Sequence, residues 1–295
     1  MADADKTLQF EQARPFLLGL AYRILGSFSE AEDVLQDIFI TWHTTETGDI
    51  ASPRAWLTTL CTRRCIDLLR SAHKARVEYV GTWLPEPIHV EANDSPEQAL
   101  ALSTSLSTAF LLLLERLTPR ERAAYLLHDI FDMDYPEVAA TLGLQEPGCR
   151  KLVSRARASV AQDKARHQAP RERQVQLLDA FQQAISSGSS QDFAALLCED
   201  VELCADSGGK VPSLRETLHG KAEVLAFVDG ALRGYWAPLR WQEIEINGGR
   251  GILLAAEDDQ IVALVTFAYD EAGRASNIYI LRNPDKLAHL ARPQA

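Results

Sequence analysis

The run from Leu117 to Val160 constrains the fold of this chain more than any other stretch. Thr118 stands three residues before Glu121, which is the spacing of a capping box at the start of a helix. A second helix is predicted to begin after Asp134 and to end at Gly143, because Asp favours helix starts and Gly favours helix ends. A third helix follows at once, so the run predicts a helix-turn-helix unit.

The helix expected from Pro147 to Val160 has two unlike sides, as its helical spacing shows. The apolar side holds Cys149, Leu152, Val153, Ala156 and Val160. The polar side holds Arg150, Lys151, Ser154, Arg155 and Arg157. A DNA major groove admits one helix, whose Arg and Lys side chains reach base edges and phosphates. A solvated cationic face is the alternative for this helix alone, but the capped helix and glycine turn before it favour DNA binding.

Charge is distributed unevenly along the chain. The formal net charge of −11 excludes a general nucleic-acid binder. Residues 144–173 nevertheless hold eight Lys or Arg against three Asp or Glu, whereas residues 174–295 hold ten against seventeen. This contrast predicts a DNA-facing module joined to an acidic part that does not touch DNA.

The five cysteines are scattered: Cys61, Cys65, Cys149, Cys198 and Cys204. They form no C-x-x-C pair and no Cys/His ligand spacing, so we expect no metal site, and nothing in the sequence indicates a cofactor. An odd, scattered count suits a reducing cytosol. With no signal-peptide pattern and only short apolar runs, we expect a cytoplasmic protein with no membrane association.

Residues 8–75 are expected to form helices only. An apolar stripe predicts a first helix over Leu8–Leu25, and Ser29 with Glu32 predicts a capping box for a second helix that runs to Trp42. Ser52 and Pro53 predict the start of a third helix, which continues to about residue 71.

This third helix is basic and lies near two tryptophans. Its cationic residues are Arg54, Arg63, Arg64, Arg70 and Lys74, and Trp56 and Trp42 lie near its start. Aromatic rings and arginine planes can hold unstacked bases, as in single-strand binding. The alternative is that both tryptophans belong to the core and the arginines are solvated.

The region from Arg76 to Pro96 is predicted to be a linker, because it combines prolines with a polar stretch. It contains WLPEP (Trp83–Pro87), whose aromatic residue between prolines is expected to dock on another part of the chain. A further helix is expected from Ser95 to Leu117.

After His167 the pattern changes. Helices are expected over residues 171–185, 193–197 and 221–232, and residues 201–206 read as a strand. From Leu239 onward the apolar residues alternate, with turn signals at Asn247–Gly249 and Glu271–Gly273. This order predicts an α+β domain in which a curved antiparallel sheet wraps on helices.

Residues 29–42, 52–72 and 117–158 together resemble bacterial sigma factors of the extracytoplasmic-function group, with both domains of that group in order. The tail resembles the SnoaL-like fold. WLPEP, DSGGK (Asp206–Lys210) and NPDKL (Asn283–Leu287) resemble the motifs of the subgroup with a fused SnoaL-like domain, although Ser207 stands where that subgroup usually has Gly. The resemblance implies two all-α sigma domains, the second a helix-turn-helix, followed by an α+β SnoaL-like cone.

The resemblance also implies a division of the chain. Residues 1–76 correspond to sigma domain 2, 77–96 to the linker, 97–167 to sigma domain 4, and 168–295 to a SnoaL-like regulatory domain. The implied partners are promoter DNA and core RNA polymerase, through its beta-prime clamp and its beta flap.

The resemblance assigns roles to particular residues. Contacts to the clamp are implied for Asp33, Gln36 and Asp37. Reading and melting of the −10 element is implied for the loop Glu46–Ile50 and for Trp56, Arg63 and Arg64, although the family often has Asn or Leu where Arg64 stands. Contacts to the −35 element are implied for Arg150, Lys151, Ser154, Arg155 and Arg157.

We hypothesise that the three subgroup motifs meet in space and exert an interdomain regulatory role. The segments are turn-like, poorly suited to a core, and lie in separate domains. Their residues are Trp83, Leu84, Pro85, Glu86 and Pro87; Asp206, Gly208, Gly209 and Lys210; and Asn283, Pro284, Asp285, Lys286 and Leu287. Trp83 and Leu84 are expected to be buried near Asp206–Lys210, beneath the C-terminal segment.

Some relatives of the SnoaL-like fold are isomerases or cyclases with an Asp or His base. Candidate groups here are Asp206, Lys210, His219, Trp236 and Tyr269. No nucleophile has a base beside it, so a polar turn at 206–210 is favoured over catalysis, and a small-molecule sensor stays open. We expect a non-enzymatic sigma factor modulated in cis by its tail. The alternative is a ligand-responsive one-component DNA-binding regulator, or a SnoaL-like isomerase or hydrolase fused to a DNA-binding half.

Overall fold

The computed structural model describes residues 2–77, 79–88, 106–161, 167 and 169–291. The chain forms two compact units. The helical unit comprises residues 1–77 and 113–163, and the sheet unit comprises residues 78–112 and 164–295. The segment that follows the third helix therefore belongs to the sheet unit, although in sequence it connects two parts of the helical unit.

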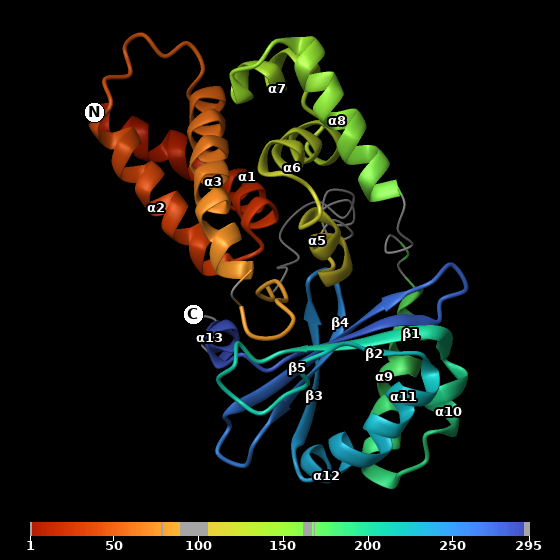
Figure 1. The fold of residues 1–295 in the computed structure, drawn as a ribbon. Helices are drawn as coiled ribbons and strands as arrows, with labels where there is room; N and C mark the ends of the chain where they lie inside the picture. Colours follow the sequence, from red (N-terminus) through yellow and green to blue (C-terminus); the bar gives the residue numbers. More distant parts are fainter. Residues whose placement is uncertain (1, 78, 89–105, 162–166, 168, 292–295) are drawn as a thin grey trace. The chain divides into compact units, whose positions relative to one another are not determined.

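The helical unit contains two groups of helices (Figure 1). The first group is α1 (Ala2–Leu25), α2 (Phe28–Thr44) and α3 (Pro53–Val77). The second is α6 (Pro119–Tyr125), a π-helical turn η1 (Leu126–Ile130), α7 (Tyr135–Leu142) and α8 (Glu146–Ala161). α5 (Thr108–Leu114) spans the boundary between the two units. Residues 95–105, where this helix was expected to begin, lie outside the described residues.

The start of α2 differs from the predicted capping box. Ser27, not Ser29, is the N-cap, and its side chain accepts a hydrogen bond from the backbone N–H of Glu30 at 3.2 Å. The physical reason is that Gly26 ends α1 at φ +70°, so the chain becomes extended at Ser27 and turns into α2 there. α1 also begins earlier than predicted and α3 ends later.

The helix-turn-helix predicted from the caps is present. Thr118 and Glu121 form a reciprocal capping box, and Asp134 accepts a hydrogen bond from the N–H of Glu137 at 2.9 Å. Gly143 ends α7 in the left-handed conformation at φ +64°. α8 buries Cys149, Val153, Ala156 and Val160, as its apolar side predicts.

The two helix groups pack together within the helical unit. The guanidinium of Arg122 is 2% exposed and donates to the carbonyl of Ile24 at 2.7 Å and to Glu115 at 2.8 Å. The rings of Phe16 and Phe131 meet edge-on with centroids 4.9 Å apart. Arg122 thus satisfies a carbonyl at the C-terminal end of α1, a position where a cation is favourable.

The sheet unit is built on one six-stranded sheet of order β2-β1-β6-β5-β4-β3. The strands are β1 (Leu197–Asp206), β2 (Leu218–His219), β3 (Arg240–Ile246), β4 (Gly249–Ala255), β5 (Ile261–Tyr269) and β6 (Ala275–Leu281). The helices are α9 (Arg171–Ser187), α10 (Gln191–Ala195), α11 (Lys221–Phe227) with a π-helical turn η2 (Val228–Leu232), α12 (Arg233–Trp236), and α13 (Pro284–Leu287) with a 3-10 turn η3 (Ala288–Ala291). Among the described strands, β1 and β6 pair in parallel and all other neighbours pair antiparallel.

Both faces of this sheet are covered, by different parts of the chain. α9, α11 and α12 lie on one face, where Phe181 and Trp236 pack against strand residues such as Val265 (Figure 1). On the other face Leu84, Ala109 and Leu287 pack against apolar residues of the strands. Leu84, in the described part of the predicted linker, therefore belongs to a core, and its burial supplies hydrophobic stabilisation.

Candidate nucleic-acid interface and motif clasp

The polar side of α8 is exposed as predicted. Arg150, Lys151, Ser154, Arg155 and Arg157 are all exposed. The same helix turns its apolar side into the helical unit, so the five side chains share one outward face.

The cations of this face differ in their partners. Arg157 donates two hydrogen bonds to the carboxylate of Asp129, at 2.8 and 2.7 Å, and this pairing raises the pKa of its guanidinium above the usual range. Arg150 pairs with Glu146 and stacks over the ring of Tyr135 at 4.1 Å. Lys151 and Arg155 have no side-chain partner in the part of the chain that the structure describes. They are therefore the cations most available for phosphate.

The residues expected at the −10 element lie on α3. Arg63 is exposed, and a Cβ added to Gly143 would stand 3.6 Å from its guanidinium, so Arg63 lies beside the turn between α7 and α8. Trp56 is half-buried, with its ring 5.4 Å from that of Trp42. Trp42 itself is fully buried and donates to the carbonyl of Lys6 at 2.9 Å. The core alternative thus holds for Trp42, whereas Trp56 is partly exposed.

The residues expected at the polymerase clamp lie on the outer side of α2. Asp33, Gln36 and Asp37 are exposed, and the first two line a groove of about 440 Å³ between α1 and α2. Asp37 forms an ion pair with Arg64 of α3 at 2.8 Å, and both side chains are half exposed. One acidic and one basic candidate, predicted for different partners, are therefore neighbours that neutralise each other.

The three motif segments meet within the sheet unit and form what we call the motif clasp: residues 79–88, 206–210 and 283–287. Its centre is the buried carboxylate of Asp206. This carboxylate accepts hydrogen bonds from the backbone N–H of Leu84 at 2.8 Å, the Tyr79 hydroxyl at 2.6 Å and the Lys286 ammonium at 2.8 Å. Leu84 is 1% exposed, as predicted, while Trp83 is only half-buried.

Lys286 is the cation of the motif clasp. Its side chain is 9% exposed and donates to the carbonyl of Leu84 at 2.6 Å as well as to Asp206. The ammonium also lies 4.4 Å from the ring centre of Trp83 and 5.0 Å from that of Tyr79. These partners are an anion, a carbonyl and two aromatic faces, so they compensate the desolvation of this buried charge.

Close approach explains the glycines of DSGGK. A Cβ added to Gly208 would stand 2.5 Å from the Asn283 side chain, and both Gly208 and Gly209 have positive φ. Ser207 does not, which is why the departure from Gly is tolerated there. Lys210 pairs with Asp285, and the Asn283 amide donates to the Tyr79 hydroxyl at 2.8 Å.

Two contributors to the motif clasp carry no local signal in the sequence. Tyr79 precedes WLPEP and binds Asp206 across 127 positions; burial and its hydrogen bond to Asp206 raise the pKa of its hydroxyl above the usual range. Ile88 exchanges hydrogen bonds with Asn247, at 2.7 Å to the side chain and 2.9 Å from the backbone.

Comparisons with known proteins agree with this architecture. Residues 9–75 match the Sigma-70 region 2 model, and residues 107–160 match the model of Sigma-70, region 4. The ECF RNA polymerase sigma factor SigJ of Mycobacterium tuberculosis is 34% identical, over 94% of this chain and 92% of that protein. The chain belongs to the extracytoplasmic-function sigma factors.

A solved structure and one further relative support the same assignment. The crystal structure of the Mycobacterium tuberculosis SigJ factor matches with a TM-score of 0.73 at 30% identity, covering 98% of this chain and all of that one. The probable ECF RNA polymerase sigma factor SigI of the same organism is 32% identical over 76% of this chain and 85% of its own length. The predicted fold class, two helical sigma regions followed by an α+β SnoaL-like domain, is confirmed.

The catalytic candidates of this sigma factor belong to different parts of the sheet unit. Asp206 and Lys210 belong to the motif clasp, and Trp236 packs in the core beside Phe181. His219 is exposed on β2 and lies 3.2 Å from Glu202. Within the described ranges no group of three or more His, Cys, Asp or Glu side chains could hold a metal ion, and no helix combines the length and apolar character needed to cross a membrane.

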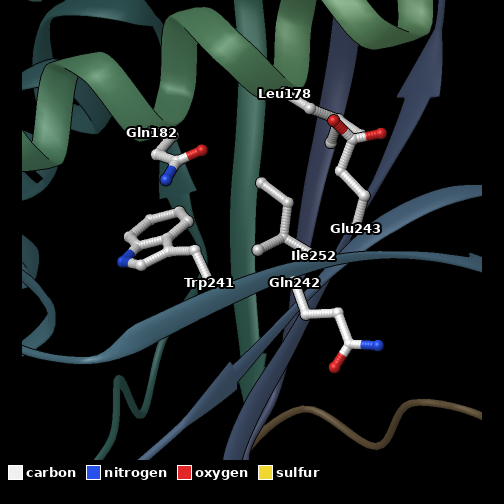
Figure 2. Close-up of a pocket in the computed structure, with 6 residues that line it drawn as sticks. All are labelled: Leu178, Gln182, Trp241, Gln242, Glu243 and Ile252. Carbon is white, nitrogen blue, oxygen red and sulfur yellow. The ribbon is translucent and has the colours of Figure 1, made fainter.

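The SnoaL-like domain has a cavity of about 300 Å³ between α9 and the edge strand β3. Leu178 and Gln182 line it from the helix, and Trp241 and Ile252 line it from the strands (Figure 2). Glu243 also points toward the helix, whereas Gln242 points away from it (Figure 2). The cavity is thus lined by one aromatic, two aliphatic and three polar residues.

Proposed function

We propose that this sigma factor directs core RNA polymerase to promoters through four surfaces of the helical unit. The exposed face of α8 contacts the −35 element. The partly exposed side chain of Trp56, with Arg63 and Arg64, reads and melts the −10 element. The outer side of α2 binds the clamp, and the helix-turn-helix part binds the flap. This is supported by the exposure of the charged side chains involved, and the protein would act in the cytoplasm, where the polymerase is.

We infer that the SnoaL-like domain modulates this activity in cis through the motif clasp. The observation that carries the proposal is the position of residues 79–88. They connect sigma region 2 to sigma region 4 in sequence, yet Asp206 and Lys286 hold them on the sheet unit. A domain that holds the connecting segment limits how far the two regions can separate. The modulation requires no catalysis, and we propose that the domain is not an enzyme.

Binding of a small molecule in the cavity beside Trp241 is a second candidate role for the SnoaL-like domain. Its volume of about 300 Å³ lies at the lower end of the range of small-molecule sites. The specific observation is that the indole of Trp241 is partly exposed and packs against Phe181. The two ring centres are 5.8 Å apart.

Run-off transcription with purified core polymerase tests the main proposal, on promoters selected from random DNA by the holoenzyme. Lys286→Met opens the motif clasp, because breaking a buried ion pair typically costs about 3–5 kcal/mol. We expect promoter-specific output to change at least about fivefold, the lower end of ordinary coupling between sites. Lys221→Met is the matched control, since Lys221 pairs with the exposed Glu199.

The outcomes separate the two parts of the proposal. Failure of the parent protein to initiate on any selected promoter contradicts the sigma function. Parental output from the Lys286→Met protein contradicts regulation in cis, provided that limited proteolysis shows residues 79–88 released.

A further inference from the structure

A second, smaller cavity of the sheet unit is lined by two residues that each carry a buried hydrogen-bond donor with no partner among the residues that the structure describes. It has a volume of about 40 Å³ and lies between the start of β4, the end of β5, α9 and residues 107–109. Tyr269 and Arg250 both line it. It is distinct from the Trp241 cavity and from the motif clasp, and nothing in the sigma function uses it.

Tyr269 contributes an unpaired hydroxyl. The residue is 6% exposed, and its hydroxyl oxygen is buried with no hydrogen-bond partner. Burial raises the pKa of this hydroxyl well above its usual range, so it stays protonated and serves as a donor. Buried polar groups are rarely left unsatisfied, because they lose their bonds to water on folding.

Arg250 contributes a guanidinium that has some, but not all, of its donors bound to protein groups. Its Nη1 donates to Glu243, and its backbone N–H donates to the side chain of Gln174 at 3.0 Å. Its Nε is buried without a partner. One edge of the planar guanidinium is therefore bound to protein, while the edge that carries Nε is not. That edge has the geometry that binds a carboxylate with two parallel hydrogen bonds.

Glycines leave the space that a ligand would need. Gly248 and Gly249 line the cavity without side chains, and a Cβ at Gly249 would meet nothing nearer than the Gln174 oxygen at 3.8 Å. The volume exceeds the ~10–15 Å³ that one water molecule requires. The cavity therefore has room for a small polar group as well as for water.

We propose that this cavity binds a small organic carboxylate, whose oxygens accept hydrogen bonds from the Tyr269 hydroxyl and the Arg250 guanidinium. The choice of ligand follows from the Tyr269 hydroxyl and the Arg250 Nε. Both are hydrogen-bond donors, so the ligand must be an acceptor. One of them is a cation with a planar fork, which selects a carboxylate. This inference is independent of the proposed sigma function.

Titration of the full-length protein with sodium acetate and sodium butyrate tests the proposal, by NMR at ionic strength held constant with chloride. We expect saturable binding with a Kd below about 10 mM, which is modest for ligands of this size. Tyr269→Phe and Arg250→Lys should each weaken binding at least about tenfold. Tyr235→Phe is the matched control, because Tyr235 is 77% exposed.

Tyr269→Phe is a clean probe, because its hydroxyl has no partner whose loss would unfold the protein. We expect its Tm to equal or exceed that of the parent. Absence of saturation below about 10 mM overturns the proposal and leaves water as the occupant. Equal affinity of the parent and the Tyr269→Phe protein for butyrate overturns it as well. So does displacement of butyrate by chloride at the concentrations at which acetate displaces it.

Discussion

At the scale of single residues, the cations of α8 fall into two classes. Arg150 and Arg157 already have carboxylate partners, whereas Lys151 and Arg155 have none among the described residues. A paired arginine must exchange a nearby carboxylate for a phosphate, so its net gain on DNA binding is smaller. Arg155 gains a phosphate partner without that loss.

We therefore predict that Arg155→Ala weakens promoter binding by the holoenzyme without loss of folding stability. If Arg155 contacts a phosphate, the slope of log affinity against log salt should become shallower by about one. If it reads a base instead, discrimination at one position should fall by about 1–3 kcal/mol. Fluorescence anisotropy over a salt series measures both quantities.

The control for this substitution is Arg215→Ala, which removes an exposed arginine of the sheet unit. An Arg155→Ala protein with parental affinity, slope and base discrimination would return α8 to the solvated-face alternative. Arg157→Ala should differ from Arg155→Ala by also lowering stability, because Asp129 is only 16% exposed and would lose its partner.

At the scale of elements, local signals predicted more than long-range ones. Thr118 and Asp134 were identified as helix starts because a cap depends on a few neighbouring residues. The prediction that Ser29 caps α2 was wrong. The spacing from Ser to Glu occurs at two positions, and the conformation of Gly26 decides between them. The packing of Leu84 against the sheet has no periodic signal in the sequence, because this contact joins segments more than a hundred positions apart.

The candidate site shows the same division. The exposed face of α8 follows from helical period alone. The three motifs were identified by their resemblance to a subgroup, and their meeting was predicted because they are turn-like, poorly suited to a core and lie in separate domains. Tyr79 was missed because no local pattern marks a tyrosine that binds a distant aspartate. The ion pair between Asp37 and Arg64 was missed because each residue was considered for a different partner.

The turn between β5 and β6 provides a prediction at this scale. The carboxylate of Asp270 accepts hydrogen bonds from the backbone N–H groups of Ala272 and Arg274, at 2.9 and 2.8 Å. Burial raises the pKa of Asp270, but these bonds and the Arg274 side chain outweigh burial and hold the pKa below its usual value. Asp270→Asn should lower the free energy of unfolding by about 1–3 kcal/mol at neutral pH.

The sign of the pH dependence follows from the lowered pKa. Asp270 stabilises the folded state above its unfolded pKa, and this contribution is lost as the pH falls through the folded pKa. The difference in free energy of unfolding between the parent and the Asp270→Asn protein should therefore become smaller below about pH 4. Urea unfolding followed at the sheet unit measures it, with the exposed Asp258→Asn as control. A gap that widens in acid would contradict the assignment.

At the scale of the whole helical unit, size conflicts with the proposed task. Promoter elements at −10 and −35 are separated by about 25 base pairs, or roughly 85 Å of duplex. A compact unit of roughly 130 residues has a radius of gyration of only about 14 Å. Helices α3 and α8 therefore cannot reach both elements while Arg122 and Phe131 hold the two helix groups together. Binding to a promoter requires these contacts to break.

This argument predicts that a covalent link across the contact blocks transcription. Phe16→Cys with Phe131→Cys places two thiols where the native rings lie 4.9 Å apart, and all five native cysteines are buried. With core polymerase present, a short bifunctional thiol reagent that is cleavable by reductant should abolish promoter-specific run-off, and reductant should restore it. Each single-cysteine protein treated alike is the control. Full activity of the linked protein would mean that one element suffices, and that the packed helix groups are the state that binds DNA.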